Sequence, residues 1–145
     1  MKLRFTLTVL AAIAFVSMNA QIIWGGPGDP NGEFDGGLND WTTVGVSSAV
    51  ADSAVNAIWV WDEDATPNEG GFSTNSPQIN SPSADNGAAV FNSNFLDDNG
   101  VPQAFGSGSA PSPHSGSLIS PVIDCSGSEN VSVTFYQDYR DFNGT

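Results

Sequence analysis

The sequence predicts an all-β fold in which short antiparallel strands are joined by long loops. Short apolar or alternating runs recur along the chain, and each is bounded by Gly, Pro, Asn or Asp. No segment after residue 20 shows the 3.6-residue periodicity of an amphipathic helix. Thirteen aromatic residues follow residue 20, which favours a packed core over disorder despite the many Gly, Pro and Ser residues. We therefore expect one compact, loop-rich β domain.

The first twenty residues have the layout of a secretory signal peptide. Lys2 and Arg4 precede an apolar run over residues 5–16, and a short polar stretch leads from it to Ala20. That run has about twelve residues, whereas a helix needs about twenty to span a bilayer. We predict cleavage between Ala20 and Gln21, a secreted or cell-surface location, and a mature chain without a transmembrane segment. A buried amphipathic helix is the alternative interpretation of the run.

The mature chain is expected to be strongly acidic. The sequence has three basic and sixteen acidic side chains, and its formal net charge is −13. Loss of Lys2 and Arg4 with the signal peptide lowers that charge by two and leaves Arg140 as the single basic side chain. Such a charge repels phosphate backbones, so we expect no nucleic-acid ligand. It suits either the binding of divalent cations or a simple solvated acidic surface.

Five strands are expected. The first two, over 41–46 and 57–61, are rich in Trp, Thr, Val and Ile, the residue types that favour strands. The next two, over 88–91 and 117–119, are short apolar runs between turn residues. The last, over 131–139, alternates most clearly, with Val131, Val133 and Phe135 on one face. A strand with such an apolar face needs neighbours, so we expect residues 34–145 to be the N-terminal portion of a β-sandwich that is incomplete at its C-terminus. A Gly/Pro-rich segment over 21–33 precedes it.

Three segments carry a resemblance to a known family. Residues 34–42 read Phe-Asp-Gly-Gly-Leu-Asn-Asp-Trp-Thr, and residues 86–93 read Asn-Gly-Ala-Ala-Val-Phe-Asn-Ser. Residues 116–127 read Gly-Ser-Leu-Ile-Ser-Pro-Val-Ile-Asp-Cys-Ser-Gly and lead into the alternating run from residue 131. Together they resemble the MAM-like jelly-roll domains of secreted bacterial surface proteins, which are also called choice-of-anchor J or cleaved-adhesin-type domains.

The resemblance covers residues 34–145. It implies an antiparallel two-sheet jelly-roll sandwich with a concanavalin-like or galactose-binding-like topology. The Ala-Gln at the end of the signal peptide is similar to that of Bacteroidetes proteins exported by the type IX secretion system. The sequence departs from the family's pattern because it contains neither the second half of the sandwich nor a C-terminal sorting domain.

The sequence offers little material for catalysis, and we predict that the chain is not an enzyme. Its single histidine, His114, lies between Pro and Ser residues in what we expect to be an exposed loop. There is no Gly-x-Ser-x-Gly motif and no pairing of Cys with His. A serine or cysteine hydrolase is therefore not expected, although sixteen acids leave a pair of catalytic carboxylates open. Cys125 has no partner cysteine, and we expect it to be buried.

Calcium is the cofactor that the composition favours, because hard oxygen ligands are abundant and soft ligands are nearly absent. The candidate loop has oxygen-bearing side chains at alternate positions: Asp62, Asp64, Thr66 and Asn68. However, Pro67 stands where an EF-hand loop has glycine. An acidic solvated turn is the alternative. Residues 97–100, Asp-Asp-Asn-Gly, are expected to form a tight turn.

Two tryptophans are candidates for stacking on a ligand. Trp59 and Trp61 are two residues apart, so they point the same way if they lie in a strand, and sugar rings stack on such side chains. Burial in the core is the alternative. Ser53, in Asp-Ser-Ala, matches the short pattern associated with O-glycosylation in Bacteroidetes.

The predicted function is a non-catalytic extracellular module for adhesion or for binding a carbohydrate or protein ligand, within a larger secreted or surface protein. Two alternatives remain open. The chain could be an ancillary domain of a secreted peptidase or polysaccharide-degrading enzyme whose catalytic part lies elsewhere. It could also be a structural component of a surface layer.

Overall fold

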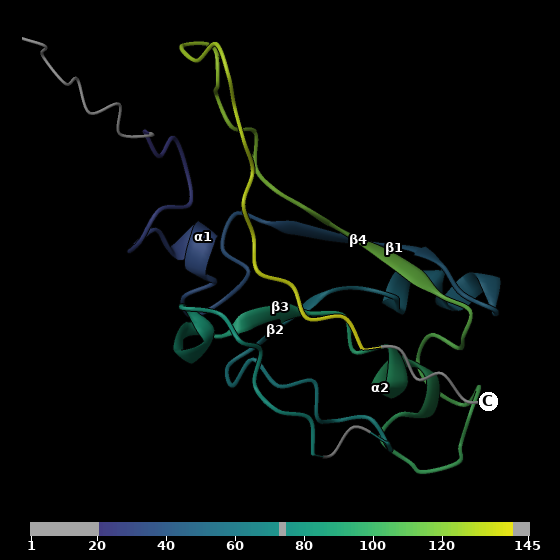
Figure 1. The fold of residues 1–145 in the computed structure, drawn as a ribbon. Helices are drawn as coiled ribbons and strands as arrows, with labels where there is room; N and C mark the ends of the chain where they lie inside the picture. The colour runs from purple at the N-terminus through teal and green to yellow at the C-terminus, as the bar shows by residue number, and fades with distance from the viewer. Residues whose placement is uncertain (1–20, 73–74, 141–145) are drawn as a thin grey trace, which may run out of the picture.

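The computed structural model describes residues 21–72 and 75–140, and most of them lie in turns and irregular segments (Figure 1). The strands are antiparallel and form two small sheets, so the prediction of a β-rich fold is confirmed at that level. In chain order the described elements are α1 (Pro30–Glu33), β1 (Thr42–Ser47), η1 (Ala51–Asn56), β2 (Val60–Asp62), η2 (Ala84–Asn86), β3 (Ala88–Val90), α2 (Ser93–Asp98) and β4 (Ser115–Ile119).

Each sheet has two strands. In the longer sheet β1 pairs with β4, and Thr42 lies opposite Ile119 at one end. In the shorter sheet β2 pairs with β3, and Val60 lies opposite Val90. The first four predicted strands are therefore confirmed, with their bounds shifted by no more than a few residues.

A pair of glycines on the longer sheet allows the segment between β1 and β2 to lie directly against it. Gly45 of β1 is opposite Gly116 of β4. A Cβ atom on Gly45 would lie 1.9 Å from the carbonyl oxygen of Ala54, and one on Gly116 would lie 2.1 Å from that of Ala57. Because glycine has no Cβ, the backbone of η1 and of Ala57 rests on the sheet, and Ala57 is completely buried.

The core at this junction is small. Ala57, Leu96 and Ala110 are buried together, and Phe91 packs against them. The valines of β1 lie on the opposite face of the sheet, where Val44 and Val46 are exposed. The inward position between them is Gly45, so this strand turns backbone, rather than large apolar side chains, toward the buried side.

The strand expected over 131–139 does not form, and that prediction was wrong. The segment is extended, and its backbone makes no hydrogen bond to any described residue. After β4 the chain runs away from the sheets, turns, and comes back as the yellow segment of Figure 1. Val133, Phe135 and Tyr139 on it are more than two-thirds exposed. Alternation of apolar residues suits a strand, but a strand also needs a partner to hydrogen-bond with, and none of the described residues supplies one.

A short helix, α2, stands where the sequence predicted only loop and a tight turn over 97–100. Asn92 caps its first turn, because its side-chain oxygen accepts from the N–H of Phe95 at 3.2 Å. Asn99 ends the helix in the left-handed conformation, with φ of 52°, and Gly100 follows with φ of 78°. The Asn-Gly pair is therefore a helix terminus and not a hairpin tip. Six residues are too few to show helical periodicity in a sequence.

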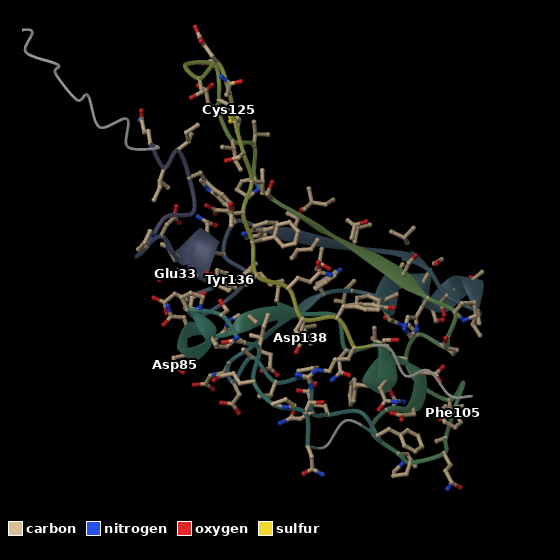
Figure 2. All side chains as sticks on the ribbon, viewed as in Figure 1. Glu33, Asp85, Phe105, Cys125, Tyr136 and Asp138 are labelled. Carbon is tan, nitrogen blue, oxygen red and sulfur yellow. The ribbon has the colours of Figure 1, made fainter. Side chains whose placement is uncertain are left out.

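Carboxylates in this fold are held mainly by backbone N–H groups. Asp98 is completely buried, and its oxygens accept from the N–H of Gly71 at 3.1 and 3.2 Å and from that of Gly100 at 2.8 Å. Asp97 likewise accepts from the N–H of Ser112 at 2.7 Å. Across residues 21–72 and 75–140 the one ion pair joins Arg140 to its near neighbour Asp138, which is labelled in Figure 2. Backbone N–H groups thus hydrogen bond to carboxylates that lysine or arginine side chains would pair with in most proteins.

Candidate functional site

An open cleft of about 560 Å³ lies between η1, β2 and α2. Its lining is mainly apolar, with a few polar side chains, which is the usual character of a ligand site. Leu96 and Asn92 are the buried residues of that surface, whereas Val60 and Phe95 are exposed. The complete lining is Asn56, Ile58, Val60, Trp61, Glu69, Asn92, Phe95, Leu96 and Ser109.

Trp61 is the aromatic platform of this cleft. Its indole N–H donates to the carbonyl oxygen of Phe34 at 2.7 Å, which fixes the ring relative to the N-terminal segment. Gly87 lies against the same edge of the ring, since a Cβ there would be 2.4 Å from the indole nitrogen. The polar edge of Trp61 is therefore occupied within the protein, and the ring surface that lines the cleft is carbon.

Trp59 does not line the cleft. Its indole N–H donates to the carbonyl oxygen of Gly116 at 3.0 Å, and its ring packs against Phe91 with centroids 5.6 Å apart. Its backbone N–H donates to the hydroxyl of Thr43 at 2.8 Å. The structure thus separates the two predicted stacking residues, with Trp61 at the cleft and Trp59 packed against Phe91 and bonded to β4.

Two polar side chains of the cleft lining, Glu69 and Asn56, each have an oxygen without a hydrogen-bond partner among the described residues. Asn92 donates to Oε2 of Glu69 at 3.1 Å, and Oε1 of Glu69 has no partner among the described residues. Asn56 donates through its amide nitrogen to the carbonyl oxygen of Ser109 at 2.9 Å, which leaves its own carbonyl oxygen open. Two such acceptors beside an apolar surface suit a ligand that carries hydroxyl donors.

The predicted calcium loop begins at the end of β2. Oδ1 of Asp62 accepts from the N–H of Thr66 at 2.9 Å, so this carboxylate closes its own turn. Asp64 and Asn68 are exposed. Within the described part of the chain, no three His, Cys, Asp or Glu side chains come together so that they could hold a metal ion. The calcium site over residues 62–68 stays a prediction.

His114 is not an exposed loop residue, and that expectation was wrong. It is half-buried, its ring meets Phe91 edge-on at 5.5 Å, and both of its nitrogens are engaged. Nε2 lies 2.7 Å from Oγ of Ser93, and Nδ1 lies 2.6 Å from the carbonyl oxygen of Ala110. The pairing of Ser93 with His114 could not be predicted, because the two residues are 21 positions apart and belong to no motif.

Three other predicted positions lie away from the cleft. Cys125 is half-buried near the outer end of the excursion that follows β4, so the expectation that it is buried was wrong (Figure 2). Ser53 lies in η1, where its hydroxyl hydrogen bonds to the carbonyl oxygen of Val50 at 2.7 Å, and its glycosylation stays a prediction. The signal peptide, up to Ala20, lies outside the described residues, and Gln21 is the first residue that the structure describes.

Comparisons with known protein families, with curated proteins and with solved structures returned no match to this chain. Over the described residues, no helix is both long and apolar enough to cross a membrane.

Proposed function

We propose that this protein is an extracellular ligand-binding module that recognises carbohydrate through the cleft between η1, β2 and α2. Trp61 carries the proposal, because its ring is held by the hydrogen bond to Phe34 and lines the same cleft as Glu69 and Asn56. Export rests on the signal-peptide pattern of residues 1–20. We also propose that the two sheets belong to a MAM-like jelly-roll sandwich, which the antiparallel pairing of β1 with β4 and of β2 with β3 supports.

The chemistry of a sugar fits this surface at two levels. The C–H face of a pyranose ring is apolar and packs on aromatic and aliphatic carbon, which Trp61 and Phe95 supply. The hydroxyl groups at the edge of the ring are donors, and they match the open oxygens of Glu69 and Asn56. The strong negative charge of the chain favours neutral sugars over sulfated or uronic ones, because like charges repel.

The test is glycan binding by the purified protein, measured on an array and then by calorimetry for the best neutral oligosaccharide. Trp61→Ala should weaken binding at least tenfold, about 1.4 kcal/mol, and Glu69→Gln should weaken it less because one oxygen remains. Trp59→Phe is the matched control, since Trp59 lies outside the cleft, and its affinity should equal that of the wild type. Binding that survives Trp61→Ala, or an array without any signal, would contradict the proposal.

A further inference from the structure

We propose that Ser93 is an activated nucleophile with His114 as its general base, a pair able to transfer acyl groups from esters. His114 of this pair packs against Phe91, and neither Ser93 nor His114 belongs to the cleft lining. The inference goes beyond the carbohydrate proposal and does not depend on it. It also departs from the expectation that the chain lacks catalytic groups.

The hydrogen bonds of His114 determine which nitrogen carries the proton. The carbonyl oxygen of Ala110 can only accept, and it lies 2.6 Å from Nδ1. In the neutral ring, Nδ1 must therefore be the protonated nitrogen, and Nε2 must carry the lone pair. Nε2 lies 2.7 Å from Oγ of Ser93, so the serine hydroxyl is the donor in that bond. This is the tautomer that a general base for a serine requires.

The surroundings hold this arrangement in place while leaving the serine accessible. The edge-on contact with Phe91 fixes the plane of the imidazole, and Ala110, which supplies the orienting carbonyl, is completely buried. Ser93 itself is exposed at the start of α2. A carbonyl oxygen thus takes the orienting role that a carboxylate has in a Ser-His-Asp triad.

The reaction follows from these positions. Oγ of Ser93 attacks the carbonyl carbon of an ester while its proton passes to Nε2 of His114. The bond from that carbon to the alkoxy oxygen then breaks, and Nε2 returns the proton to the departing alcohol. The acyl group remains on Ser93 as an ester. A water molecule, deprotonated by the same nitrogen, hydrolyses that ester to the free acid and restores both side chains.

The experiment uses the purified full chain and a fluorescent alkyl fluorophosphonate, which labels activated serines with loss of fluoride. We expect one label per chain, located on Ser93 by peptide mass spectrometry. Ser93→Ala should abolish labelling, and His114→Gln should slow it at least about a hundredfold. Ser107→Ala is the matched control, because Ser107 is also exposed but donates to the carbonyl oxygen of Ala104 rather than to a histidine. Its labelling rate should equal that of the wild type.

A second variant keeps the test decisive if His114→Gln destabilises the fold. Ser93→Cys, made together with Cys125→Ala, places the one remaining thiol beside His114. Iodoacetamide should alkylate it at least about ten times faster than glutathione at pH 7, because the histidine favours the thiolate. Absence of label on Ser93, equal labelling of the wild type and His114→Gln, or alkylation no faster than that of glutathione would each overturn the proposal.

Discussion

Replacing Gly45 by alanine tests whether the close approach of η1 to the longer sheet stabilises this fold. The added Cβ would lie 1.9 Å from the carbonyl oxygen of Ala54, so that oxygen must retreat by 1.5 Å to reach the 3.4 Å of ordinary contact. The obstacle is backbone, which cannot rotate away as a side chain can. We therefore take the upper end of the range for overpacking, about 3 kcal/mol. Alanine is favoured over glycine by about 0.5–1 kcal/mol, which leaves a net loss of about 2 kcal/mol.

The assay is urea unfolding followed by tryptophan fluorescence, since Trp59 packs beside this junction. The loss should appear as a lower midpoint with an unchanged slope, and as a melting temperature lower by about 7 °C. Gly127→Ala is the control, because nothing lies within 4 Å of the Cβ it would add, and its stability should stay within about 0.5 kcal/mol of the wild type. If Gly45→Ala were as stable as Gly127→Ala, the packing argument would be refuted.

Three more predictions concern the carboxylates. Asp98→Ala should lower the free energy of unfolding by about 2–3 kcal/mol in the same urea assay, because it leaves the N–H of Gly71 without its acceptor. Hydrogen bonds from the Ser126 hydroxyl and then from its backbone N–H hold the pKa of Asp124 below its usual value. Asp124 therefore stabilises the fold above its unfolded pKa and stops doing so as the pH falls through its lower folded pKa; Ser126→Ala should raise that pKa in an NMR titration. If residues 62–68 bind calcium, added calcium should raise the melting temperature, EDTA should reverse the rise, and a midpoint insensitive to both would remove the hypothesis.

The positions of four strands could be predicted from the sequence because their cause is local. The run containing Trp59 and Trp61 and the run before Val46 consist of residue types that suit a pleated backbone wherever they occur. Their pairing was harder to foresee. The pairing of Gly45 with Gly116 joins segments that are far apart in sequence. The backbone that covers each glycine reaches it only through folding.

Two of the wrong predictions depend on contacts between segments that lie far apart in sequence, and a third depends on local capping residues. Residues 131–139 alternate well, but none of the described residues pairs with them. α2 depends on caps at Asn92 and Asn99, which a search for periodicity does not detect. His114 was expected to be exposed because Ser93 and Phe91, which lie against its ring, become its neighbours only through folding.

The reliance on peptide N–H groups to hold carboxylates bears on the conditions this protein tolerates. A protein stabilised by ion pairs loses some of that stability as dissolved salt screens them. Here the described residues contain a single ion pair, at the exposed Arg140, whereas buried Asp98 is held by amides. Salt then acts chiefly on the repulsion among sixteen acids and relieves it. We therefore expect this fold to be more stable in seawater or brine than in fresh water.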